Sequence, residues 1–187
     1  MHHSLQEQGY TEVFDRDISA LLNPRPVLLV GSFREKANFA TIIWATPISH
    51  DPAMLAVALR NTSKTFQDLQ ATECFSINIL DASLANLPTL CGTQSGHDTD
   101  KSKLVPHYLA KHIGREPSSS AEKQIPFVKE ALSIIDCQVE SIIETGDHNL
   151  ILAYVCGGWT RKKDFEEGAI PVEESLLCVK RQQFTTL

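Results

Sequence analysis

The sequence predicts a mainly β domain whose strands run antiparallel and whose helices are insertions between strands. Apolar runs of strand length follow one another, with short connections, along most of the 187 residues. Helical spacing of apolar residues beyond the first strand occurs in two places, after the third and the fourth strand-like runs. The alternating strand–helix rhythm of a doubly wound parallel sheet is therefore missing. An antiparallel barrel with helical excursions fits the pattern better.

Proline residues and charged turns separate three predicted strands in the first third of the chain. Each strand is a short apolar run rich in branched side chains. The three strands span residues 26–33, 39–46 and 54–60. Pro24 and Pro26 end a short helical segment at 18–22 and begin the first strand, because proline cannot continue a helix. Pro47 ends the second strand, and the turn at Asp51-Pro52 leads into the third.

The pattern becomes helical after the third strand. Residues 61–65 offer several N-cap side chains, and Phe66 and Leu69 continue with helical spacing. Strict alternation over residues 74–80 then predicts a strand with one buried face and one polar face. A second helix at 83–90 and a polar loop at 92–100 follow.

The second half of the chain predicts a surface excursion and a long hairpin. Glycine, proline and a serine run mark the excursion at residues 111–121. Two long β-type runs, 131–143 and 149–159, are joined by a turn containing Gly146-Asp147, and a last short strand lies at 176–180. No repeat or linker divides these six or seven strands. We therefore expect a single domain over 1–187, with a core of about 24–160 and a C-terminal extension at 161–187.

Composition limits the classes of partner. The net charge of −6 argues against nucleic acid and anionic membranes, which require a basic face. No apolar run approaches the ~18 residues of a membrane span. Five cysteines are scattered without a C-x-x-C pair, and no signal peptide is present. These features predict reduced thiols and a cytoplasmic location.

Several familiar catalytic motifs are missing from the sequence. There is no G-x-G-x-x-G or P-loop pattern for nucleotides and no G-x-S-x-G nucleophile elbow. The histidines lack the spacing of zinc ligands, so we expect no metal site.

Three polar clusters remain, and each has a functional and a plain interpretation. In residues 38–46, alternation places Asn38, Trp44 and Thr46 on one face, which could line a planar aromatic ligand or belong to an ordinary half-buried strand. Residues 60–65 combine hydroxyls and cations with a helix start, which suits an anion or simply caps the helix. Residues 92–101 could bring backbone N–H groups and Lys101 to an anion, although Asp98 and Asp100 oppose this, or could form a plain surface loop.

Taken together, four motifs resemble a known family. They are W-A-T-P-I-S-x-D-P from Trp44, S-x-T at Ser63, C-G-T-x-S-G from Cys91 and G-D-H from Gly146. Their order and spacing resemble the flavin-reductase-like FMN-binding family, and most of all its flavoredoxin branch. The similarity spans roughly residues 25–159.

The resemblance implies an antiparallel split β-barrel of Greek-key type that works as a homodimer and holds FMN non-covalently near the dimer interface. It implies that Asn38, Trp44, Ala45 and Thr46 lie at the flavin ring and that Ser63, Lys64 and Thr65 hold the phosphate. Further cofactor contacts are implied for Ser95, Lys101, His148 and the C-terminal aromatic Phe184. His148 is the one residue implied to be catalytic, because histidine changes charge near neutral pH.

The implied function is an oxidoreductase or electron-transfer flavoprotein. Electrons would pass from NAD(P)H or a protein donor through FMN to a small-molecule or protein acceptor. One version releases reduced FMN as a flavin reductase, and the other retains FMN and relays electrons as a flavoredoxin. The alternative from another class is a non-enzymatic ligand-binding or interaction module on the same barrel.

Overall fold

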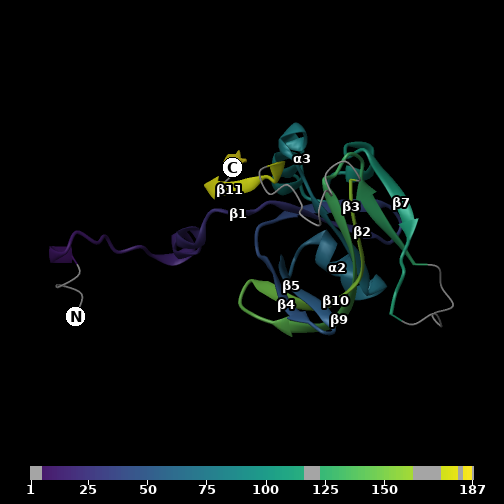
Figure 1. The fold of residues 1–187 in the computed structure, drawn as a ribbon, viewed down its shortest axis with the longest axis horizontal. Helices are drawn as coiled ribbons and strands as arrows, with labels where there is room; N and C mark the ends of the chain where they lie inside the picture. Colours follow the sequence, from purple (N-terminus) through teal and green to yellow (C-terminus); the bar gives the residue numbers. More distant parts are fainter. Residues whose placement is uncertain (1–5, 116–122, 162–173, 181–182, 187) are drawn as a thin grey trace.

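A curved seven-stranded antiparallel sheet forms the centre of the fold (Figure 1). The computed structural model describes residues 6–115, 123–161, 174–180 and 183–186. The strands of the sheet, in spatial order, are β3 (Ala37–Ile42), β2 (Leu28–Phe33), β6 (Cys74–Ile79), β9 (Ser133–Glu144), β10 (His148–Thr160), β5 (Ala53–Arg60) and β4 (Ala45–His50).

The two edge strands of this sheet are consecutive in the chain. β3 pairs with β2 alone and β4 with β5 alone, yet only Ile43 and Trp44 separate β3 from β4. The sheet must therefore curve until its two edges meet at this short link. The result is a barrel that is split between β3 and β4, as the sequence analysis predicts.

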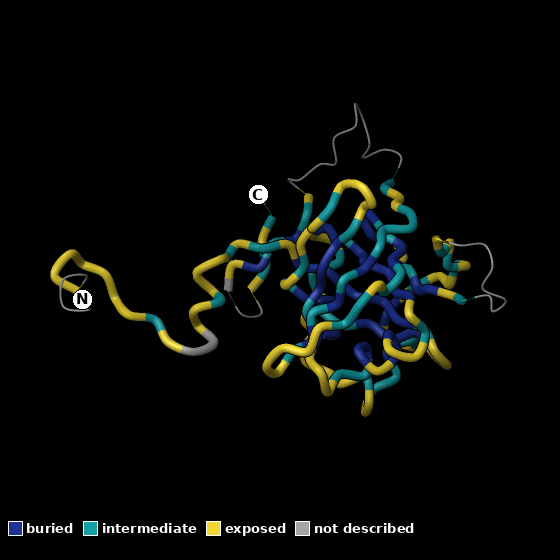
Figure 2. Tube along the Cα trace, turned by 90° about the horizontal axis from the view of Figure 1, so that it is seen from below, coloured by how far each residue is buried: buried dark blue, intermediate teal, exposed yellow. Residues whose placement is uncertain are grey.

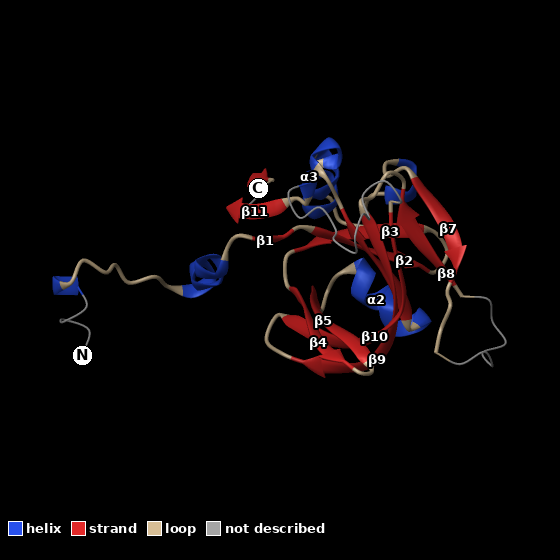
Figure 3. Ribbon diagram, in the orientation of Figure 1, coloured by secondary structure: helices blue, strands red, loops and turns tan. Residues whose placement is uncertain are grey.

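Smaller elements cover the sheet (Figure 3). The helix α2 (Lys64–Thr72) packs inside its curve, and α3 (Asn86–Thr93) packs on the outer side of β3. Two further sheets are present, the hairpin β7–β8 and a three-stranded sheet of β1, β11 and β12. Their bounds are His107–Lys111 and Gln124–Val128 for the hairpin, and Arg25–Pro26, Leu177–Lys180 and Gln183–Thr185 for the other sheet. Short 3-10 helices lie at η1 (Asp15–Leu22), η2 (Ala82–Leu84) and η3 (Lys101–Lys103).

Both faces of the central sheet are buried at strand β2. Alternate side chains of β2 divide between two apolar clusters: Leu28 and Val30 join one inside the barrel, and Leu29 joins one beneath α3 and the C-terminal strands. Figure 2 shows this buried centre, with residues 6–22 extending away from it. No helix within the described ranges is long and apolar enough to cross a membrane.

Helix α2 forms where the sequence predicts it. The Ser63 hydroxyl caps its first turn by accepting a hydrogen bond from the Phe66 N–H (3.1 Å). The helix ends at Glu73, which takes a left-handed conformation (φ 57°) while its N–H donates to the Leu69 carbonyl. Phe66 and Leu69 point into the barrel cluster, so burial of these two side chains fixes which face of the helix turns inward.

The predicted strand at 39–46 is wrong as a single element. The chain bends at Ile43-Trp44, so that Ile42 and Ala45 both pack on the barrel cluster and the alternation changes phase. Pro47 lies within β4 rather than ending a strand. An edge strand tolerates proline because its N–H side needs no partner.

The polar face predicted for 74–80 is also wrong, because the hairpin β7–β8 covers it. Ser76 and Asn78 are fully buried. The Ser76 hydroxyl donates to the Pro126 carbonyl, and the Asn78 amide oxygen accepts from the Val128 N–H (2.8 Å). The sequence analysis missed this hairpin, since its strands are short and one contains proline.

Two boundaries also differ from prediction. The helix expected at 83–90 is a 3-10 turn followed by α3, which runs on to Thr93 and shortens the predicted loop. Residues 107–111 are a strand, whereas the predicted excursion at 111–121 falls mostly outside the described residues. Beyond residue 161, strand β11 pairs with β1, and β12 is an additional strand that the sequence did not predict.

Gly31 in β2 lies where the hairpin crosses the sheet, and we expect alanine there to be destabilising. A Cβ at this position would lie 2.4 Å from Ser76 Oγ and 2.8 Å from the Pro126 carbonyl oxygen. Overpacking of this kind costs about 1–3 kcal/mol. Urea unfolding of Gly31→Ala should show this loss of stability. Gly146→Ala is the matched control, because no atom lies within 4 Å of the Cβ that it adds. Equal stability of both variants would contradict the packing described.

Candidate functional site

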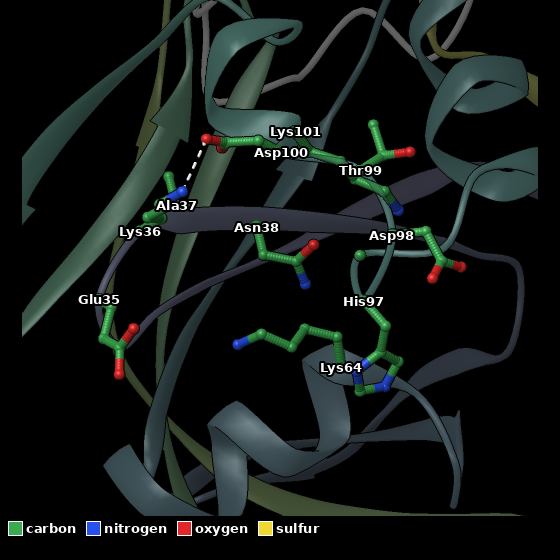
Figure 4. Close-up of a pocket in the computed structure, with 11 residues that line it drawn as sticks. Glu35, Lys36, Ala37, Asn38, Lys64, His97, Asp98, Thr99, Asp100 and Lys101 are labelled. Carbon is green, nitrogen blue, oxygen red and sulfur yellow. Dashed lines mark hydrogen bonds and ion pairs between the residues drawn. The ribbon is translucent and has the colours of Figure 1, made fainter.

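A polar cavity of about 330 Å³ lies between the start of α2, the beginning of β3 and the loop after α3 (Figure 4). Its lining comes from three separate stretches of the chain. The lining residues are Glu35, Lys36, Ala37, Asn38, Lys64, Gly96, His97, Asp98, Thr99, Asp100 and Lys101. Three of the predicted site residues, Asn38, Lys64 and Lys101, are among them.

The side chain of Asn38 joins β3 to the first turn of α2. Its amide nitrogen donates to the buried Thr65 hydroxyl (2.8 Å) and lies 3.5 Å from Ser32 Oγ. Its amide oxygen has no hydrogen-bond partner in the described part of the chain, although the residue is only 6% exposed. A buried polar atom without a partner costs on the order of 1–3 kcal/mol, so this oxygen suits a ligand that donates a hydrogen bond.

The loop after α3 approaches Asn38 so closely that it requires glycine at residue 96. A Cβ on Gly96 would lie 2.4 Å from the Asn38 amide oxygen. The neighbouring His97 contacts the Thr62 carbonyl through its ring atom Nε2 (3.2 Å), and the backbone N–H of His97 donates to the Ser95 hydroxyl. Ser95 thus shapes the loop, while His97 ties the loop to the segment before α2.

The three lysines that line the cavity all have partners in the protein. Lys64 forms an ion pair with Asp68 one turn along α2, and Asp68 has no exposed side-chain surface. Lys36 pairs with Asp100 (2.9 Å). The buried Lys101 ammonium donates to the Phe39 and Cys91 carbonyls, both at 2.8 Å. Burial lowers the pKa of Lys101, and these two contacts hold it between β3 and α3.

A second group of predicted residues gathers at the end of β5, with Trp44 before β4 on one side of this strand and His148 at the start of β10 on the other. The rings of Trp44 and His148 lie 4.8 Å apart, centre to centre. His148 Nδ1 contacts the Asp147 carboxylate (2.7 Å), and this contact lowers the pKa of Asp147. Ala45 packs on the barrel cluster, and the exposed Thr46 hydroxyl donates to the Pro47 carbonyl.

The segment from Arg60 to Ser63 connects the two groups. Arg60 pairs in register with His148, and the Asn61 N–H donates to the Asp147 carbonyl (3.3 Å). The same segment accepts the His97 contact at Thr62 and ends in the Ser63 cap of α2. One short connection therefore places the Trp44–His148 pair beside the start of the helix.

Phe184 is the predicted residue that the structure places elsewhere. It lies in β12 opposite Cys178 and packs on the cluster beneath α3. No described contact links it to the cavity or to Trp44. Its implied role at the flavin therefore has no support from the position of its ring.

Asp68, Gly96 and His97 shape the site but were not among the predicted site residues. Asp68 could have been found from its i, i+4 spacing to Lys64 on a predicted helix. His97 lies in a loop whose path depends on the tertiary structure, so no local signal marked it. No group of three or more histidine, cysteine, aspartate or glutamate side chains in the described part is arranged to hold a metal.

Asp100 at the rim of the cavity is held by a serine hydroxyl and two lysines. Hydrogen bonds from Ser102 and Lys36 lower the pKa of its carboxyl to about 2. We expect carboxyl-detected NMR to show this low pKa and Ser102→Ala or Lys36→Gln to raise it. Lys103→Gln should raise it less, because that ammonium is 3.8 Å away. An Asp100 pKa that none of these changes moves would contradict the arrangement.

Comparison with known proteins agrees with this fold. Residues 21–187 match the model of the flavin reductase like domain. An uncharacterized protein of Pyrococcus abyssi is 30% identical over 152 residues, which cover 81% of this chain and 82% of that protein. An FMN-binding protein from Thermus thermophilus superposes with a TM-score of 0.80 at 21% identity, covering 95% and 94% of the two chains. A flavoredoxin from Methanosarcina acetivorans gives a TM-score of 0.78 at 20% identity, covering 95% and 92%. The chain therefore belongs to the flavin reductase like domain family.

Proposed function

We propose that this chain is an oxidoreductase that binds FMN non-covalently, with the phosphate at the start of α2 and the flavin ring toward Trp44 and His148. Membership of the flavin reductase like domain family supports a flavin cofactor. The observation that carries the placement is the buried Asn38 amide oxygen at the wall of the cavity, which has no hydrogen-bond partner among the described residues.

The residues present fit the chemical groups of FMN. The ribityl chain carries hydroxyls that can donate to the Asn38 amide oxygen. The first turn of α2 presents backbone N–H groups and the positive end of the helix dipole, which favour a phosphate. Ser63, Lys64 and Thr65 all belong to this turn or cap it, and none of its residues is acidic. Ser95 and the backbone at Gly96 would close the site from the opposite loop.

When bound, FMN supplies the electron-transfer chemistry, and the protein supplies binding and orientation. Trp44 offers an aromatic surface that is 37% exposed. His148 can hold or release a proton beside that surface, with its ring oriented by Asp147.

We further propose that NAD(P)H or a reduced protein is the electron donor and that a small molecule or protein is the acceptor. A Streptomyces globisporus NADH:FAD oxidoreductase with the same fold (TM-score 0.73, 17% identity) supports the nicotinamide donor.

We also propose that the protein is a homodimer and that it is located in the cytoplasm. The edge strand β4 exposes Ile48, and the exposed Trp44 directly precedes this strand, which supports pairing of two subunits. None of the five cysteines, all in the described part, forms a disulfide, which supports a reducing compartment.

The test is an absorbance titration of the purified protein with FMN. We expect about one flavin per subunit, and we expect Thr65→Val to weaken FMN binding tenfold or more. This variant removes the hydroxyl that accepts from Asn38 at the helix start. Thr72→Val is the control, because Thr72 lies at the other end of the same helix and its hydroxyl bonds to the Asp68 carbonyl.

Equal loss of FMN in both variants would point to damage to the helix rather than to the site. A wild-type protein that does not bind FMN would overturn the proposal and favour a non-enzymatic module on this barrel. For the bound protein, oxidation of NADH or NADPH with FMN as the sole added flavin would then identify the donor.

A further inference from the structure

The ion pair between Lys64 and Asp68 determines what the cavity can offer to an anion. Lys64 is the lysine at the start of α2, and its side chain is one-third exposed. Its ammonium nevertheless contacts the carboxylate of Asp68, which lies inside the protein with no exposed surface. The positive charge of Lys64, which faces the cavity, is thus neutralised by the buried Asp68 carboxylate.

The buried Asp68 carboxylate depends on the Lys64 ammonium as its charged partner. Its other carboxylate oxygen accepts one hydrogen bond, from the buried Ser32 hydroxyl (3.0 Å). Removing the ammonium would leave a buried negative charge with a single neutral donor, which is strongly unfavourable. A phosphate that enters the cavity therefore meets a lysine that remains bound to Asp68, together with the negative charge of Asp68 itself.

We propose that Asp68 is a specificity-determining residue that reduces the contribution of the phosphate to flavin binding. This inference rests on the proposed function, since it concerns the same site. The phosphate gains from the helix start and its N–H groups, but it gains little from Lys64. FMN then binds only modestly more tightly than a flavin without the phosphate, and bound FMN exchanges readily with free flavin. Such a site suits a protein that takes up and releases flavin more than one that retains it.

The test compares FMN with riboflavin, which has the same ring and ribityl chain but no phosphate. The quantity measured is the dissociation constant for riboflavin divided by that for FMN, obtained by fluorescence titration. In the wild-type protein we expect this ratio to be only modestly above one. In Asp68→Asn the buried charge is gone, while the side-chain oxygen can still accept from Ser32. Lys64 is then released toward the cavity, and FMN should gain about tenfold over riboflavin, because no carboxylate any longer neutralises this ammonium.

A double variant separates this charge effect from a change of structure. Asp68→Asn with Lys64→Gln contains neither charge, so it leaves no unpaired carboxylate in the core. We expect it to lose the tenfold gain and to return to the wild-type ratio. Glu140→Gln is the control, because it removes an exposed carboxylate of β9 that lines neither cavity. We expect the ratio to change less than twofold there, because solvent screens that charge.

The outcomes distinguish the inference from the function on which it rests. If wild-type protein binds neither FMN nor riboflavin, the proposed function fails. If both flavins bind but Asp68→Asn leaves the ratio unchanged, or lowers it, Asp68 does not oppose the phosphate and the inference is wrong. A gain that persists in the double variant would also overturn it, because the gain would not come from Lys64. Circular dichroism and thermal melting of each variant verify that the fold is intact.

Discussion

Buried hydrogen bonds fix the first turn of α2 against strands β2 and β3, and the candidate site depends on them. Asp68 accepts from Ser32 of β2, and Thr65 accepts from Asn38 of β3. These four side chains are buried, so water cannot replace the bonds if the helix rotates or slides. On the inner side, Phe66 and Leu69 anchor the helix in the barrel cluster. The helix start is therefore presented to the cavity in one orientation.

The fixed position of α2 also determines where the Trp44–His148 pair lies, because the residues that precede the helix connect it to this pair. Arg60 ends β5 beside His148, and the next residues bond to the hairpin turn and to His97 before Ser63 caps α2. The Trp44–His148 pair and the cavity are thus positioned by one strand end and the helix that follows it. The split in the barrel contributes as well, because the bend at Ile43-Trp44 carries the chain from the β3 edge to the β4 edge.

Local sequence signals predicted most helices and strands but not the tertiary contacts between them. An N-cap within residues 61–65, the strands around it and the long hairpin follow from propensity and turn chemistry, and the structure confirms them with Ser63 as the cap. Asn38 was named from the alternation of residues 38–46 and Thr65 from the polar cluster at the helix start, whereas their mutual hydrogen bond joins residues far apart in the chain. The bend at Ile43-Trp44 was missed because the residues on either side keep an apolar β-type pattern. The burial of Ser76 and Asn78 was missed because it requires a hairpin contributed by residues 107–128. The site residues Gly96 and His97 likewise depend on the path of a loop.

The most direct test of this account is an NMR titration of the labelled protein with FMN. If the helix start is the anion site, the backbone amides of Lys64, Thr65 and Phe66 and the side-chain amide of Asn38 should shift together on binding. The amides of Gln70 and Thr72, at the far end of the same helix, should move little. Shifts that instead gather around Gln70, Ile142 and Glu144, which line a second cavity between α2 and the long hairpin, while the amides at the helix start stay in place, would put the ligand elsewhere and contradict the account.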